Sequence, residues 1–199
     1  MEEARLATPS GRLGIWLFIC TEILLFGGLF LLYSMYRYKY AVDFHNASLE
    51  LSKFDGTLNT CILLTSSLTV ALAIHFLAEK RTDLAKLLLI ATIAFGAAFI
   101  VVKGFEWGTK FIHGLYPNSP VLDQRPKGEI LYFGLYFMMT GLHALHVLVG
   151  MGVLTAILIF VTRGSVTPER PLLMENGGLY WHLVDVIWIF LFPLFYLIT

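Results

Sequence analysis

Residues 130–160 read ILYFGLYFMMTGLHALHVLVGMGVLTAILIF, contain no Asp, Glu, Lys or Arg, and exceed the roughly 20 apolar residues that cross a bilayer as a helix. Four further apolar runs are long enough to span a membrane, at about 13–36, 58–78, 84–107 and 179–198. Each is expected to be helical, because a backbone in lipid must satisfy its own hydrogen bonds. The sequence therefore predicts an all-α polytopic membrane protein, with one membrane domain over residues 1–199 built as a five-helix bundle.

Composition supports this class and argues against others. Apolar residues make up 57% of the chain, and 14 basic residues balance 14 acidic ones. No basic stripe with interleaved aromatic residues is present, so a nucleic-acid role is not expected. The first apolar run is too long for a secretory-signal core, so we expect it to remain in the mature protein. Cys20 and Cys61 are expected at different membrane depths, which argues against a disulfide between them.

The orientation is not determined by charge. The 14 basic residues divide equally between the two sides of the predicted bundle, so the positive-inside rule gives a tie. The short basic loop 78–86 favours a cytoplasmic amino terminus. The two long connections, 37–57 and 108–129, are expected to lie on the same face.

Glu22 is the most deeply placed acidic residue of the first run. It lies about nine residues into that run, or about 14 Å along a helix. A charged carboxylate at this depth is costly, so we expect Glu22 to be buried and protonated. Its role is either a structural hydrogen bond to a neighbouring helix or that of a proton-holding or lipid-contacting carboxyl.

Two histidines lie in the fourth run, within Thr140-Gly-Leu-His143-Ala-Leu-His146-Val. A spacing of three places them near one face of a helix. A transition-metal site would need further ligands, so a hydrogen-bonding role is favoured, with metal binding and proton relay as the alternatives. If the first and fourth runs are antiparallel, His143 lies at a depth similar to that of Glu22. We therefore predict that Glu22 approaches His143 or His146 directly or through one water.

The fifth run contains a second polar motif, Tyr180-Trp-His182-Leu-Val-Asp185-Val-Ile-Trp188. No nucleophile accompanies this histidine and carboxylate, so hydrolytic catalysis is not indicated. His75 and Glu79, at the end of the second run, could join His182 and Asp185 in a polar cluster at the inner interface. Such a cluster would collect protons or bind headgroups, and the alternative is that these side chains simply snorkel to the interface.

Three other polar features have structural interpretations. Glu106 follows Lys103 by three residues near the end of the third run, a spacing that permits an ion pair. The second run is rich in hydroxyl and amide side chains, which are expected to form interhelical hydrogen bonds. Aromatic residues near the predicted ends of runs, including Tyr132 and Tyr136, are expected to anchor the helices at the interface.

Taken together, these segments resemble subunit III of the haem-copper respiratory oxidases. The resemblance covers the Glu22 helix, the second run with His75 and Glu79, Glu106 of the third run, and the two histidine motifs. It is closest to the shorter bacterial members, which lack the first two of seven helices.

The resemblance implies a non-catalytic accessory subunit with no catalytic residue, metal ligand or cofactor in this chain. Haem and copper would lie in partner subunits, and subunit I, other oxidase subunits and membrane lipids would be the partners. The complex would be a proton-pumping terminal oxidase, of cytochrome c oxidase type, in the bacterial cytoplasmic membrane. The chain would support proton uptake and the stability of the catalytic subunit, and phospholipid could contact its remaining helices.

Other functions stay open at this point. An accessory subunit of a quinol oxidase or a nitric oxide reductase would share the same motifs. A stand-alone membrane oxidoreductase would use Glu22, His143 and His146 as a metal site, and an independent proton carrier would use them as a proton pathway.

Overall fold

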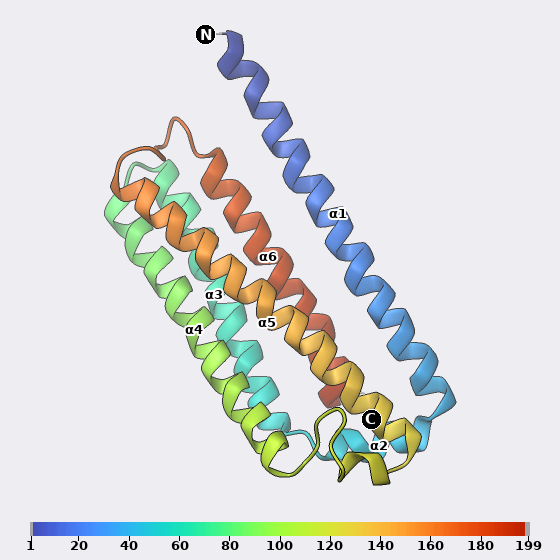
Figure 1. The fold of residues 1–199 in the computed structure, drawn as a ribbon. Coiled ribbons are helices and arrows are strands. Elements are labelled where there is room, and N and C mark those ends of the chain that lie inside the picture. The colour runs from blue at the N-terminus through green and yellow to red at the C-terminus, as the bar shows by residue number, and fades with distance from the viewer. Residues whose placement is uncertain (1, 198–199) are drawn as a thin grey trace.

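The computed structural model describes the backbone of residues 2–197 and the side chains of residues 12–197. This part of the chain is helical throughout its regular structure (Figure 1), with five long helices: α1 (Glu2–Lys39), α3 (Lys53–Ala78), α4 (Thr82–Ile112), α5 (Lys127–Thr162) and α6 (Leu172–Phe192). The short elements are α2 (Ala41–Leu49), the 3₁₀ helix η1 (Leu122–Gln124) and the π-helical turn η2 (Pro193–Leu197), which continues α6. All five long helices are apolar and long enough to cross a membrane, which confirms the predicted five-helix bundle.

The five helices are not packed equally. Figure 1 shows α3, α4, α5 and α6 side by side, with α1 lying along one flank and projecting past them at its amino-terminal end. Helix α1 packs mainly against α5 and α6. Large apolar side chains such as Leu24, Leu31 and Met35 remain more than two-thirds exposed on its outer face, where lipid would solvate them. The Glu22 side chain of α1 lies on the opposite face of this helix, which packs against the bundle.

All five long helices extend beyond the predicted apolar runs, and the extensions of α4 and α6 affect the polar sites. Helix α4 continues to Ile112 instead of ending near residue 107, and α6 begins at Leu172 instead of near residue 179. The third run appeared to end among charged residues, yet Lys103 and Lys110 are buried against other parts of the chain. The start of α6 contains Glu175 and two glycines, and these glycines leave no room for a Cβ beside neighbouring helices.

The two long connections lie at the same end of the bundle, as predicted. The first contains α2, whose Asp43 Oδ2 accepts a hydrogen bond from the amide of Gly128 at 3.1 Å. Arg125 Nη1 lies 3.1 Å from both Glu50 Oε1 and Glu129 Oε2, and Lys110 Nζ donates to the carbonyl of Glu50. The hydrogen bond to Glu50 raises the pKa of Arg125. These contacts tie α2, α4 and α5 together at what we call the α2 end of the bundle.

Helix α3 makes the interhelical hydrogen bonds that its polar side chains predicted. Trp181 Nε1 donates to Ser66 Oγ and Trp188 Nε1 to Thr60 Oγ1, each at 3.0 Å. The Trp181 ring also lies between Gly96 and Gly150, where an added Cβ would come within 2.8 and 2.9 Å of ring atoms. Small residues on α4 and α5 thus allow α6 to approach them closely.

The expectation that Tyr132 and Tyr136 anchor the interface is wrong. Both side chains are fully buried, and Tyr132 Oη donates to the carbonyl of Phe195 at 2.7 Å. Their placement follows from η2, which extends the fifth span to Leu197 and covers this part of α5. The cysteines Cys20 and Cys61 are both free and exposed.

Candidate functional site

Glu22 of α1 and His146 of α5 form a direct pair inside the membrane-spanning region. His146 Nε2 lies 3.0 Å from Glu22 Oε2, and each side chain is 12% exposed. This contact confirms the prediction that Glu22 approaches one of the two histidines. The prediction rested on the similar depth of Glu22 and His143 on antiparallel helices, and the structure brings Glu22 to His146 instead, three residues further along α5.

The surroundings of His146 restrict where protons can lie. His146 Nδ1 is 2.8 Å from the carbonyl of Leu142, which can only accept, so Nδ1 carries a proton. A proton at the Nε2 contact then belongs either to Glu22, as a neutral acid beside a neutral ring, or to His146, as an ion pair. Oε2 is fully buried, and its contact with Nε2 is close without meeting the geometry of a hydrogen bond. In both states the pair has no net charge, as burial in lipid favours.

A shallow groove lies over this pair, and we call it the Glu22 groove. Its volume is about 220 Å³, and its walls are Phe18, Glu22, Leu145, His146, Val149 and Tyr180. Phe18 and Tyr180 stack with ring centroids 5.8 Å apart, and Tyr180 Oη donates to the carbonyl of His146 at 3.1 Å. Leu145 and Val149 are at least half exposed, so the groove opens towards lipid.

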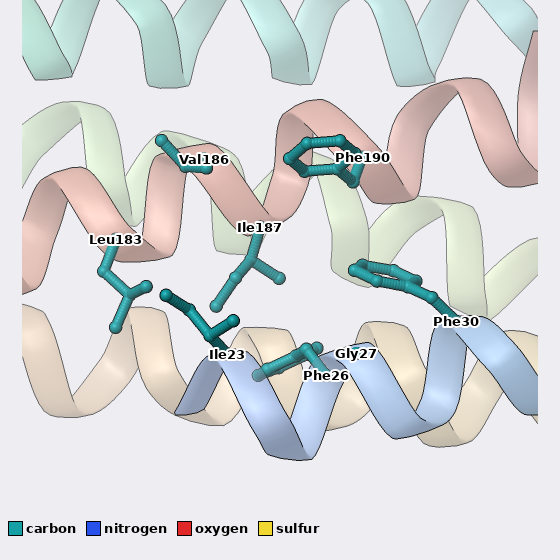
Figure 2. Close-up of a pocket in the computed structure, with 8 residues that line it drawn as sticks. All are labelled: Ile23, Phe26, Gly27, Phe30, Leu183, Val186, Ile187 and Phe190. Atoms are coloured by element: carbon teal, nitrogen blue, oxygen red, sulfur yellow. The ribbon is translucent and has the colours of Figure 1, made fainter. Parts of the chain in front are cut away.

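A second groove, between α1 and α6, is lined by apolar side chains and one glycine (Figure 2). It has a volume of about 270 Å³ and is formed by Ile23, Phe26, Gly27, Phe30, Leu183, Val186, Ile187 and Phe190. Phe26 also packs edge-on against His146, with centroids 5.5 Å apart. With no polar side chain to orient a ligand, this groove suits hydrocarbon and offers no specific recognition.

His143 does not share the environment of His146. It is fully buried between Phe99 of α4 and Trp188 of α6, with ring centroids 5.4 and 5.2 Å away. Neither ring nitrogen has a hydrogen-bond partner among residues 12–197. The two histidines therefore contact different helices. In the described part of the chain, no three His, Cys, Asp or Glu side chains gather as a metal site would require.

The predicted cluster of His75, Glu79, His182 and Asp185 is divided into two parts. His75 Nε2 lies 3.3 Å from Glu79 Oε1 at the end of α3, and these side chains are 60% and 48% exposed. His182 Nδ1 instead lies 2.7 Å from Ser67 Oγ. Ser67 precedes His75 by eight residues, or about 12 Å of helix.

The depth of the second part was also mispredicted. Because α6 begins at Leu172, His182 and Asp185 lie at least ten residues inside the helix, about 15 Å from its start, and not at the interface. Asp185 is 3% exposed, and neither carboxylate oxygen accepts a hydrogen bond from residues 12–197.

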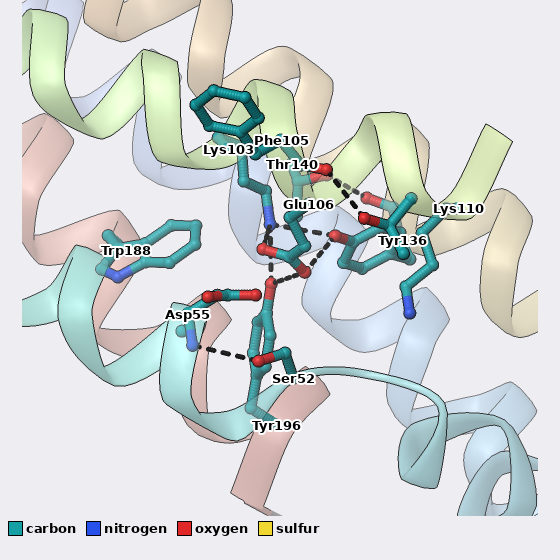
Figure 3. Close-up of polar contacts among 12 residues, drawn as sticks. Ser52, Asp55, Lys103, Phe105, Glu106, Lys110, Tyr136, Thr140, Trp188 and Tyr196 are labelled. Atoms are coloured by element: carbon teal, nitrogen blue, oxygen red, sulfur yellow. Dashed lines mark hydrogen bonds and ion pairs between the residues drawn. The ribbon is translucent and has the colours of Figure 1, made fainter. Parts of the chain in front are cut away.

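A buried polar network surrounds Glu106, and the sequence revealed only part of it. The predicted ion pair is present, with Lys103 Nζ 3.1 Å from Glu106 Oε2. Tyr136 of α5 and Tyr196 of η2 each donate to Glu106 Oε1 at 2.6 Å, and Lys103 Nζ lies 3.0 and 2.6 Å from their hydroxyl oxygens (Figure 3). The side chains of Lys103 and Glu106 are 3% and 2% exposed.

We call these four residues the Lys103 network. The prediction placed its ion pair near a helix end, whereas the structure buries it because α4 continues for six residues beyond Glu106. Every polar group in the network has a partner, so it is suited to fastening α4, α5 and η2 rather than to reacting with a ligand. The sequence signal for this site was a lysine and a glutamate three residues apart inside a membrane span.

Comparison with known proteins assigns the family. Residues 5–199 match the family model for cytochrome c oxidase subunit III. The chain belongs to this family. It is 32% identical to a probable quinol oxidase subunit 3 of Staphylococcus haemolyticus, covering 94% of this chain and 88% of the relative. It is 31% identical to cytochrome c oxidase subunit 3 of Thermostichus vulcanus, covering 94% and 87%.

A third relative joins two subunits in one protein. The heme-copper oxidase subunit I+III of Aeropyrum pernix is 29% identical over 94% of this chain, which spans only 22% of that protein's length. Together with the five membrane helices, family membership identifies the chain as an integral membrane subunit of a haem-copper oxidase complex. The resemblance seen in the sequence motifs is thereby confirmed.

Proposed function

We propose that this chain is the non-catalytic subunit III of a proton-pumping terminal oxidase, packed beside the catalytic subunit I. The observation that carries the proposal is how its membrane-embedded ionisable groups are used. Glu22 pairs with His146, Glu106 and Lys103 lie in a closed network, and His182 bonds to Ser67. These residues each contact a neighbouring polar side chain, and the His, Cys, Asp and Glu side chains of the described residues do not converge on one centre. Haem and copper then belong to partner subunits.

The proposal includes a partner and an orientation. A relative in which subunits I and III form one protein supports subunit I as the neighbour. The basic loop between α3 and α4 and the ion pair of Arg12 with Glu175, at 3.3 Å, lie at the end opposite α2. We assign that end to the cytoplasmic side of a bacterial inner membrane, following the positive-inside rule.

The role of the subunit in the complex is to sustain proton uptake and to protect the catalytic subunit during turnover. His75 and Glu79 are exposed at the proposed cytoplasmic end, where an imidazole beside a carboxylate can exchange protons with water. His182 and Asp185 lie too deep to collect protons at that surface directly.

Removal of the chain from the purified complex tests this function. We expect the haem spectrum to be unchanged, while activity decays faster during turnover than in the intact complex. The double variant His75→Ala/Glu79→Ala should lower the rate of proton uptake without changing initial electron transfer. The control is Lys86→Ala, which removes an ionisable side chain at the same end of the bundle and should not change proton uptake. Immediate loss of haem absorbance on removal of the chain would contradict the proposal.

The electron donor is the remaining question for the complex. The quinol oxidase and cytochrome c oxidase relatives are almost equally similar to this chain, at 32% and 31% identity. A quinol oxidase is therefore the second candidate, beside the cytochrome c oxidase that the sequence motifs suggest. Purification in mild detergent, followed by identification of the partner subunits and a haem spectrum, distinguishes them.

A further inference from the structure

We infer that the Glu22 groove binds the hydroxylated ring of an isoprenoid quinol, with the tail in the surrounding lipid. The groove combines an apolar wall with one paired ionisable group, the usual composition of a small-molecule site. The inference concerns binding only and no redox step. It goes beyond the proposed function and applies whichever donor the complex oxidises.

The first argument is the hydrogen-bonding state of Glu22. Oε2 lies 3.0 Å from His146 Nε2 and is fully buried, whereas Oε1 is not fully buried and none of the side-chain hydrogen bonds among residues 12–197 goes to it. Whether the shared proton lies on Oε2 or on the imidazole, Oε1 remains an acceptor without a donor. A polar atom left unpaired in an apolar medium is unfavourable, so the site selects a ligand that supplies a donor. Hydrocarbon supplies none.

The second argument is depth. Arg12 of α1 pairs with Glu175 of α6 at 3.3 Å, with both side chains exposed, and this pair marks the polar boundary at one end. Glu22 lies ten residues further along α1, about 15 Å deeper, which is half of the roughly 30 Å hydrocarbon thickness. A phospholipid headgroup, held at the boundary, cannot reach Oε1. A donor carried on a lipid-soluble ring can.

The third argument is the shape of the groove. Phe18 and Tyr180 form a stacked aromatic wall, with an interplanar angle of 28°, against which a flat ring can pack. The volume of about 220 Å³ is below the roughly 300–1,000 Å³ of drug-sized sites, which suits one substituted ring and leaves a long tail outside. A quinol has a hydroxyl donor on such a ring, whereas the corresponding quinone has only acceptors. The site should therefore prefer the reduced form.

Photolabelling of the whole oxidase complex in phospholipid vesicles tests the inference. The probe is a decyl-substituted benzoquinol with a ring azide, used without oxygen, and the matched probe is the corresponding azidoquinone. We expect the quinol probe to label α1 near Phe18 or α5 near Leu145, and the quinone to label these helices about tenfold less. A tenfold difference corresponds to about 1.4 kcal/mol, the size of one hydrogen bond. Unlabelled decylbenzoquinol should compete, whereas phosphatidylglycerol and diacylglycerol should not.

Two substitutions separate hydrogen bonding from packing. Glu22→Leu removes the acceptor and should lower labelling about tenfold, whereas Glu22→Gln retains an amide oxygen and should preserve most of it. Asp83→Leu, at a 96% exposed position on α4, is the control and should label as the native complex does. Equal labelling by quinol and quinone, competition by diacylglycerol, or unchanged labelling in Glu22→Leu would overturn the inference.

An independent measurement covers the case in which Glu22→Leu fails to assemble. Adding decylbenzoquinol to the native complex should shift the infrared carbonyl or carboxylate band that is absent in Glu22→Gln, and adding the quinone should not. No shift with either compound would overturn the inference. The turnover-stability test of the proposed function does not involve this groove, so either result can fail while the other holds.

Discussion

Replacing Lys103 with Met tests whether the Lys103 network is sealed from water and lipid. The substitution keeps an unbranched side chain of similar length but removes the ammonium group 3.1 Å from Glu106 Oε2. Glu106 is then left as a buried carboxylate with only the two tyrosine hydroxyls as donors. Breaking one side of a buried ion pair typically costs about 3–5 kcal/mol, and we expect the free energy of unfolding to fall by about that amount.

The same helix provides a matched control. Lys86 Nζ lies 3.1 Å from Asp83 Oδ1, with the same spacing of three residues and the same distance, but these side chains are 31% and 96% exposed. Exposed ion pairs contribute about 0–1 kcal/mol, so Lys86→Met should have a small effect. Because the two ion pairs have the same spacing and the same distance, a difference in the loss of stability between the two variants reflects the difference in burial.

The assay is unfolding of the purified chain in mixed detergent micelles, followed by helical circular dichroism as the denaturing detergent is increased. The double variant Lys103→Met/Glu106→Leu removes both charges and should lose less stability than the sum of the single variants. If Lys103→Met costs no more than Lys86→Met, the network is not sealed and the reasoning is refuted.

Three further predictions concern other sites. Gly150→Ala should lower the free energy of unfolding by about 1–3 kcal/mol, because the new Cβ would lie 2.9 Å from Trp181 Cε3, whereas Gly152→Ala on the same helix meets nothing within 4 Å and should be tolerated. Infrared difference spectra should show a protonated carboxyl band that Glu22→Gln abolishes and Glu79→Gln retains, and a fully ionised, water-exposed Glu22 would contradict this. Arg125→Met should cost about 0–1 kcal/mol, since the side chain is 33% exposed. The hydrogen bond to Glu50 raises the pKa of Arg125 above its ordinary value, so the contribution of Arg125 is fully present below that ordinary value and is lost only at still more alkaline pH. The cost should therefore not change when unfolding is repeated at neutral and mildly alkaline pH.

The sequence alone was sufficient for the membrane architecture and for one tertiary contact. Long apolar runs specify spanning helices, because a helix satisfies all of its backbone hydrogen bonds within one segment, as lipid requires. The approach of Glu22 to one of the two histidines was predicted because depth along an antiparallel helix depends on residue number and rise, but which histidine it meets was left open. The hydroxyl-rich face of α3 likewise predicted hydrogen bonds to other helices, although not that Trp181 and Trp188 would be the donors.

Helix ends and lateral neighbours were decided only by the tertiary structure. Residue number gives depth, but the rotation of each helix about its axis and its choice of neighbours depend on packing in three dimensions. For this reason His143 faces Phe99 and Trp188 while His146, three residues later, faces Glu22. Polar residues such as Lys103 and Glu175 look like the ends of membrane spans until partners distant in sequence pair with them. Tyr196 reaches Glu106 because η2 prolongs the last helix beside α4 and α5, an arrangement that no local pattern in the sequence encodes.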